Sequence, residues 1–160
     1  KGFIVTAIGS YIQKKLGKKV GVTPGAEMLK AIKLAKEYKI QIALIDQDIQ
    51  VTIKKLMKMI TWKEKIHFLK DITIGLIKRE RLPFSLHKVP EEKVIHFLIE
   101  KIKLRYPTVY NIIIYERNAI MAKNLYKLMT SHPQAQIVAV IGAGHKQEIV
   151  GDIKSRIQNK

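Results

Sequence analysis

Apolar residues recur at intervals of three and four along most of the chain, with charged or polar residues between them. That spacing places the apolar side chains on one face of an α-helix, which can then pack against other elements. The pattern predicts amphipathic helices over residues 2–17, 24–38, 49–60, 61–81, 90–105, 116–129 and 146–157. Helix is therefore expected to outweigh strand.

Two local signals indicate where helices begin. Thr23 precedes Pro24, which gives a capping hydroxyl and a proline at the first helical position. Thr61 and Glu64 have the spacing of a capping box, in which each residue satisfies a backbone N–H of the other. We therefore divide the basic stretch from 49 to 81 into two helices at Thr61.

Two short segments carry apolar residues in a different pattern. Residues 40–45 and 136–141 contain no charge and several β-branched side chains, which is typical of strands buried on both faces. Residues 108–115 are ambiguous. The run Ile112–Ile114 favours a strand, whereas Pro107 at a possible first helical position favours a helix.

These elements predict an α/β fold with a small, mostly parallel sheet packed among helices. We expect one domain over residues 1–160, with a basic helical hairpin inserted at about 49–105. Two strands alone make a marginal sheet, and the sequence begins with Lys1, so we expect a piece of a longer protein. An exposed sheet edge would then favour a homo-oligomer.

The net charge and the amino-acid composition limit the classes of function that the chain can have. Thirty Lys and Arg against thirteen Asp and Glu give a formal charge of +17, which suits nucleic acid, an anionic membrane surface or a biased genome. The lysines are scattered and no arginine–aromatic cluster occurs, so we expect no dedicated nucleic-acid binding. No run of eighteen apolar residues occurs, which excludes a membrane span within this sequence. The absence of cysteine excludes disulfides and thiolate chemistry.

The strongest candidate chemistry follows the segment 136–141. Ligands of α/β proteins collect where strands end and helices begin. Gly142 and Gly144 would let the backbone turn sharply and approach a ligand closely. His145 would then be placed to bind a metal or move a proton. The alternative is a strand that needs glycines to turn, followed by an exposed histidine.

Acidic residues offer further candidates. Asp46 and Asp48 follow the segment 40–45 and could bind a metal or orient a histidine or arginine, or else cap the next helix. We assign the capping role to Asp48 and regard Asp46 as the better site candidate. Glu27 lies in the first turn of a predicted helix, where the helix dipole also stabilises a carboxylate.

Arg117 lies in the predicted first turn of the helix over 116–129, where the dipole disfavours a cation. It could grip a carboxylate or phosphate with its guanidinium, or pair with an acid. The basic helices over 49–81 could form a lid, a dimerisation arm or a helix pair resting on anionic lipid; an ordinary solvated face is the default interpretation.

Four motifs occur in an order that resembles the TraB/PrgY family, the pheromone-shutdown proteins, in its archaeal form. They are Gly-Ala-Glu-Met at 25–28, Ile-Asp-Gln-Asp-Ile at 45–49, Glu-Arg-Asn with Met-Ala at 116–122, and Val-Ile-Gly-Ala-Gly-His at 140–145. This family is similar to the Tiki proteins and to the ChaN/EreA-like α/β superfamily. The Tiki branch implies a metal-dependent peptidase or hydrolase.

The resemblance also implies roles for individual residues. Glu27, Arg117 and His145 would be catalytic, with Glu27 and His145 binding a divalent Mn, Co or Zn ion and Arg117 stabilising an oxyanion. The remaining motif residues would contribute to binding: Asp46, Asp48, Gly142, Gly144 and Asn118.

Two departures from the family pattern set limits. Gln47 stands between the two aspartates where the family usually has arginine, and the family's first Gly-x-x-His motif is absent. We therefore expect an incomplete hydrolase core. A non-catalytic module that binds a peptide or signalling molecule is the alternative. The resemblance also implies a cytoplasmic domain of a membrane-anchored protein, with membrane contact through the full-length chain.

Overall fold

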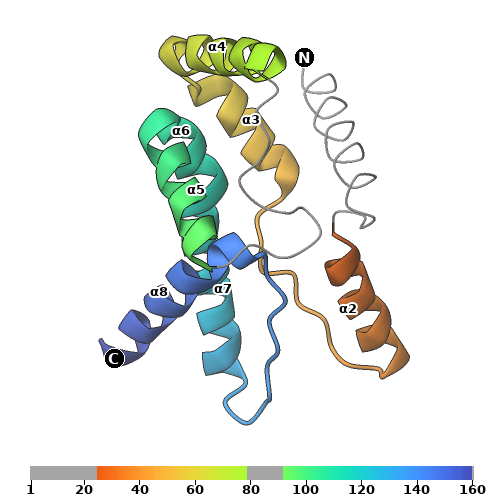
Figure 1. Ribbon diagram of the computed structural model, residues 1–160. Helices are drawn as coiled ribbons and strands as arrows, with labels where there is room; N and C mark the ends of the chain where they lie inside the picture. Colours follow the sequence, from red (N-terminus) through yellow and green to blue (C-terminus); the bar gives the residue numbers. More distant parts are fainter. Residues whose placement is uncertain (1–24, 79–91, 160) are drawn as a thin grey trace. The chain divides into compact units, whose positions relative to one another are not determined.

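The structure is a computed structural model that describes residues 25–78 and 92–159, and helices account for all of its regular elements (Figure 1). The predicted helix over 2–17 lies outside these residues. The elements in chain order are α2 (Ala26–Glu37), α3 (Ile49–Met59), α4 (Trp62–Lys78), α5 (Glu92–Arg105), α6 (Pro107–Tyr110), the π-helix η1 (Asn111–Tyr115), α7 (Glu116–Ser131), the 3₁₀-helix η2 (Ala143–His145) and α8 (Lys146–Gln158).

The chain divides into two compact units. The first unit comprises Lys1–Gln47 and Asn118–Lys160, and the second comprises Asp48–Arg117. Within residues 25–78 and 92–159, no helix combines the length and apolar character needed to cross a lipid bilayer.

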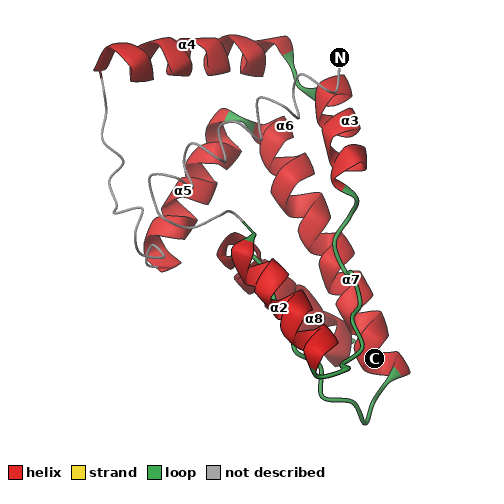
Figure 2. Ribbon diagram, turned by 90° about the vertical axis from the view of Figure 1, so that its right-hand side faces the viewer, coloured by secondary structure: helices red, strands yellow, loops and turns green. Residues whose placement is uncertain are grey.

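The predicted α/β fold is wrong. Residues 40–45 and 136–141 form loops, and the described part of the chain contains no strand and no sheet (Figure 2). Their apolar side chains point largely to solvent, with Leu44 85% and Val138 82% exposed. β-Branched residues favour strands only where a neighbouring strand accepts their hydrogen bonds and packs on their side chains. Neither segment has such a neighbour among the described residues.

The ambiguous segment 108–115 is helical. Pro107 occupies the first turn of α6, where its missing N–H costs nothing, and the chain continues through η1 into α7. Ile112 is fully buried in the second unit. The proline signal therefore outweighed the strand preference of the three isoleucines.

The first unit has a small apolar core between α7 and α8. Met121 and Ala122 on α7 meet Ile149 and Ile153 on α8. The core is extended by partly buried side chains from the loops and from α7: Ile45, Leu125 and Ile141. The spacing of Ile149 and Ile153 by four residues explains why α8 folds as a helix with one side inward. In the same unit, Gly25 precedes α2 with a left-handed backbone (φ 80°), which glycine adopts most readily.

Polar contacts join the helices of the second unit. The predicted capping box is confirmed, because the Glu64 N–H donates to the Thr61 hydroxyl at 3.3 Å and the Glu64 carboxylate accepts from the Thr61 N–H and hydroxyl at 3.0 and 2.8 Å. It also accepts one from the backbone N–H of Thr108, at 2.7 Å, where α6 begins. Lys55 on α3 donates to both carboxylate oxygens of Glu116 at 2.6 and 2.7 Å.

Candidate functional site

His145 stands at a junction between a loop and a helix. The backbone is extended at Gly142, turns once through η2, and enters α8 directly after His145. The backbone N–H of His145 donates to the carbonyl of Gly142 at 3.0 Å and closes the turn. The predicted helix over 146–157 is thereby confirmed, and His145 occupies the position just before its first residue.

The His145 ring is held by a chain of hydrogen bonds. Its Nδ1 lies 2.5 Å from Oδ1 of Asn118, and Nδ2 of Asn118 donates to the carboxylate of Glu148. A carboxylate can only accept, so the Asn118 amide must present its oxygen to the ring. The ring therefore donates its Nδ1–H, which places the lone pair of the neutral imidazole on Nε2.

Asn118 is the buried centre of this cluster. Its side chain is 4% exposed, and it lies one turn before the core residues Met121 and Ala122 on α7. Hydrogen bonds gain electrostatic strength where water is excluded, and packing fixes the rotamer of the group that makes them. The apolar core thus holds the amide that in turn orients His145.

Glu148 is a member of this cluster that the sequence analysis missed. It lies in the first turn of α8, where the helix dipole stabilises a negative charge. The signal that could have found it is the interval of three residues from His145, which brings the two side chains onto neighbouring positions of one helical turn. The structure thus brings together two predicted site residues, His145 and Asn118, and adds a third.

The chain turns directly after Gly142, as predicted, but the turn does not require glycine at this position. The Gly142 backbone (φ −63°, ψ 141°) is one that any residue adopts. A side chain at this position would instead approach the histidine, since an added Cβ would lie 3.4 Å from Cδ2 of His145. Gly144 lies half-buried within η2.

The acidic site candidates Asp46 and Asp48 form hydrogen bonds with residues close to them in the sequence. Asp48 caps α3 by accepting a hydrogen bond from the Gln50 N–H at 2.7 Å, as the sequence indicated. Asp46 accepts from the backbone N–H of Gln47 at 2.7 Å. Glu27 is exposed in the first turn of α2. Their binding and catalytic roles stay predictions.

Arg117 belongs to the second unit. Because the helix continues from Pro107 through η1, Arg117 is not in a first turn, and the expected conflict with a helix dipole does not arise. Its Nη1 donates to the carbonyl of Ile113 at 3.2 Å, within the π-helix. The predicted oxyanion role stays a prediction.

The described residues alone do not fit a metal centre. A catalytic zinc site uses three protein ligands and a water molecule. Over residues 25–78 and 92–159, no three His, Asp or Glu side chains are grouped closely enough to hold an ion. His145 and Glu27, the ligands implied by the family resemblance, are thus not part of a complete donor set there.

The first unit also contains an open surface pocket of about 280 Å³ beside the end of α7, with a mostly apolar lining. Its lining comes from α7 and from the loop that follows: Leu125, Met129, His132, Pro133, Ala135, Ile137 and Ala139. A pocket of this size and lining suits a small apolar side chain or fragment.

Comparison with known proteins gives a match across most of the chain. The model of the TraB/PrgY/gumN family matches residues 3–154. An uncharacterized protein of Methanocaldococcus jannaschii is 36% identical over 156 residues, which is 95% of this chain and 38% of that protein. The chain therefore spans less than two fifths of the length of this relative. No solved structure matches the chain.

Proposed function

Because the chain belongs to the TraB/PrgY/gumN family, we propose that it is part of a metal-dependent hydrolase or peptidase to which it contributes His145. The observation that carries the proposal is the hydrogen-bonded chain from His145 through Asn118 to Glu148. A histidine whose Nδ1–H is held by an oxygen acceptor presents Nε2 in a fixed direction. This is the arrangement that both metal-ligating and proton-transferring histidines use.

Each member of the chain has a distinct role in this proposal. His145 accepts a proton or provides one metal ligand through Nε2. Asn118 is a positioning residue, because it acts only through the ring of His145. Glu148 fixes the orientation of the Asn118 amide, because its carboxylate accepts a hydrogen bond from Nδ2 of Asn118. The remaining ligands of a divalent Mn, Co or Zn ion would come from the rest of the protein, with Glu27 as a candidate from this chain.

Metal binding by the full-length protein tests this proposal. We expect calorimetry with Zn²⁺, Co²⁺ or Mn²⁺ to show binding that His145→Ala abolishes and Asn118→Leu weakens by about 10- to 100-fold. His96→Ala is the matched control, since His96 is an exposed histidine on α5, and it should leave the affinity unchanged. Equal affinity of the His145→Ala and unaltered proteins would contradict the proposal.

The second candidate is a non-catalytic module that binds a peptide or signalling molecule. The mostly apolar pocket beside α7 favours it, because it accepts an apolar side chain without needing a metal. Filling the pocket with Ala139→Trp should abolish peptide binding and leave metal binding intact. Peptide hydrolysis that depends on His145 would exclude this candidate.

We further propose that the full-length protein is membrane-anchored with this portion in the cytoplasm, and that the chain self-associates. The exposed apolar side chains of Leu44 and Val138 support self-association, since such surfaces are usually covered. Light scattering should show dimers or larger species that Leu44→Lys with Val138→Lys converts to monomers. A monomer at high concentration before substitution would contradict this.

A further inference from the structure

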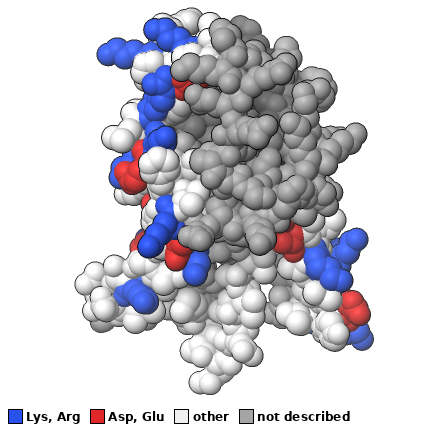
Figure 3. All heavy atoms as spheres, in the orientation of Figure 1, with Lys and Arg blue, Asp and Glu red and all other residues white. Residues whose placement is uncertain are grey.

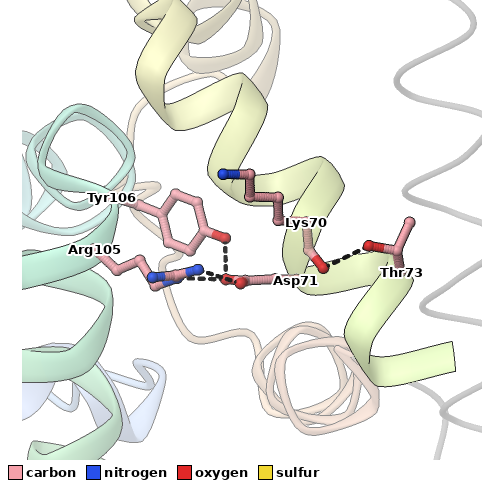
Figure 4. A network of polar contacts seen from close by, with 5 residues as sticks. All are labelled: Lys70, Asp71, Thr73, Arg105 and Tyr106. Atoms are coloured by element: carbon pink, nitrogen blue, oxygen red, sulfur yellow. Dashed lines mark hydrogen bonds and ion pairs between the residues drawn. The ribbon is translucent and has the colours of Figure 1, made fainter. Parts of the chain in front are cut away.

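Helix α4 packs within the second unit through polar side chains. Glu64 is 2% exposed and accepts three hydrogen bonds from Thr61 and Thr108. Asp71, seven residues later and so on the same side of the helix, binds Arg105 and Tyr106 (Figure 4). Nε of Arg105 and the hydroxyl of Tyr106 donate to Oδ2 of Asp71 at 2.6 and 2.5 Å. The inward side of α4 is therefore its acidic side.

The outward side of α4 is apolar. Trp62, Ile66 and Leu69 have the spacing i, i+4 and i+7, which places them on one stripe. Trp62 is 77% exposed and Leu69 64%, and Ile66 is exposed with them. Ile72 widens the exposed apolar surface beside this stripe. An amphipathic helix normally turns such a stripe toward its own core. Phe68 and Ile74, which lie off this stripe, are exposed as well, so α4 leaves apolar side chains in water on more than one side.

Over residues 62–74 of α4, the charged residues that are fully exposed are lysines. Its acidic residues, Glu64 and Asp71, are the two that turn inward. Lys63, Lys65 and Lys70 are exposed around the apolar stripe. In Figure 3, basic side chains project at the top of the view, where Figure 1 draws α4. Nζ of Lys65 lies 4.4 Å from the centre of the Trp62 ring, so the cation and the aromatic ring form one surface.

We propose that this face of α4 docks on an anionic lipid bilayer, with Trp62, Ile66 and Leu69 entering the interface and the three lysines contacting phosphate head groups. A helix with an apolar face and flanking lysines lies in the plane of the interface. Tryptophan prefers that depth, and lysine stems reach back to the head groups. Nucleic acid would match the lysines but leave Ile66 and Leu69 in water. This surface does not depend on the proposed hydrolase site.

Trp62 makes the docking directly observable, because it is the only tryptophan of the sequence. The 160-residue protein is titrated with vesicles of 30% phosphatidylglycerol in phosphatidylcholine and with vesicles of phosphatidylcholine alone. We expect the Trp62 emission to shift to shorter wavelength, and brominated lipid to quench it, with the anionic vesicles only. No shift with the anionic vesicles would overturn the proposal, as would an equal shift with both.

Two pairs of variants separate the apolar contribution to vesicle binding from the electrostatic contribution. Leu69→Glu should abolish vesicle binding. Leu104 on α5 is also a leucine and is 83% exposed, so Leu104→Glu is the matched control and should reduce vesicle affinity only by the small effect of one added negative charge. Replacing Lys63, Lys65 and Lys70 by Gln should weaken binding by roughly fivefold per lysine at low salt. The same change at Lys30, Lys33 and Lys36 on α2 should have a smaller effect.

Other occupants of this face give different results. Circular dichroism first confirms that each variant is folded. Trp62 emission that is already shifted without vesicles, or that shifts with protein concentration, would show that protein covers the face and would overturn the proposal. Binding of the Leu69→Glu variant to anionic vesicles with unchanged affinity would also overturn the proposal. RNA that displaces the Leu69→Glu and Leu104→Glu variants from the vesicles equally well would overturn it too.

Discussion

Helices α8 and α4 carry similar patterns of apolar residues but turn opposite sides inward. In the first unit, α8 buries Ile149 and Ile153 and leaves Lys146, Glu148 and Lys154 exposed. In the second unit, α4 buries Glu64 and leaves Trp62 and Leu69 in water. The spacing of apolar residues thus indicates that a helix forms, but the neighbouring elements decide which of its sides is covered.

The neighbours differ in what they offer. α8 meets the apolar side chains Met121 and Ala122 of α7, so burying isoleucine removes apolar surface from water on both sides. α4 meets the N–H of Thr108 and the side chains of Arg105 and Tyr106, which are hydrogen-bond donors. Burying a carboxylate is costly unless donors satisfy it, and these donors do so.

Removing apolar volume beneath α8 should have the largest effect. Ile149→Ala leaves a cavity among Met121, Ala122 and Ile153, and we expect the free energy of unfolding to fall by about 3 kcal/mol in urea titrations. The matched control is Ile157→Ala on the same helix, where the side chain is half exposed and the loss should stay below about 1 kcal/mol. Equal losses would show that α8 does not pack through its predicted side.

Removing the carboxylate beneath α4 should have the next largest effect. Glu64→Ala leaves the Thr61 and Thr108 N–H groups without their acceptor, and we expect a loss of about 2 kcal/mol. Glu100→Ala removes only an exposed ion pair with Lys103 and should cost less than about 0.5 kcal/mol. If the Glu64→Ala protein were as stable as the Glu100→Ala protein, the buried carboxylate would not stabilise α4, and the contrast between α4 and α8 would fail.

Breaking the hydrogen bond between His145 and Asn118 should have a smaller effect on stability. Nitrogen NMR should show the His145 ring as its Nδ1–H tautomer, and Asn118→Leu should shift it toward the Nε2–H form that free histidine favours. The lost hydrogen bonds should reduce the free energy of unfolding by about 1 kcal/mol. An unaltered ring that is already Nε2–H would contradict the deduced direction of the hydrogen bonds.

Acid should have the smallest effect, through the partly exposed contact that Asp71 of α4 makes with Arg105 and Tyr106. Hydrogen bonds from Arg105 and then Tyr106 lower the pKa of Asp71 to about 2. The folded pKa lies below the unfolded value, so this contact contributes fully above pH 4 and is lost as the pH falls toward 2. Carbon NMR of the Asp71 carboxyl should give that pKa, and Arg105→Gln should raise it. An Asp71 pKa near 3.8 in the unaltered protein would contradict the contact.

Glu64 extends the same acid dependence into the buried contact. Burial raises the pKa of Glu64, but hydrogen bonds from Thr61 and Thr108 outweigh it and hold the pKa of this carboxyl below its usual value. Its contribution to stability is therefore also lost on the acid side of the ordinary glutamate range.

Sequence signals located most helices of the described chain but not the fold class. The capping box at Thr61 and the proline at 107 are short-range signals, and local hydrogen bonds decide them. The strands predicted at 40–45 and 136–141 needed partners elsewhere in the chain, which local composition does not encode. Tertiary pairing, rather than propensity, determined those segments.

In the candidate site, too, local sequence signals located individual residues, whereas tertiary packing determined how they are arranged. His145 was recognised by its position after the glycines, and Asn118 by its motif, and the structure joins them. Glu148 was missed because it lies outside the four motifs and its contact is made with Asn118, thirty residues away in the sequence. The orientation of the Asn118 amide depends on packing between α7 and α8, which no spacing along the chain reveals.

One carboxylate serves the starts of two helices that are far apart in the sequence. Glu64 binds the N–H of Thr61 before α4 and the N–H of Thr108 at the start of α6. Fraying of either start removes an interaction from the other, so these amides should open as one cooperative unit in hydrogen exchange. A local fluctuation at one end of α4 is thereby felt more than forty residues away, at the turn that begins α6.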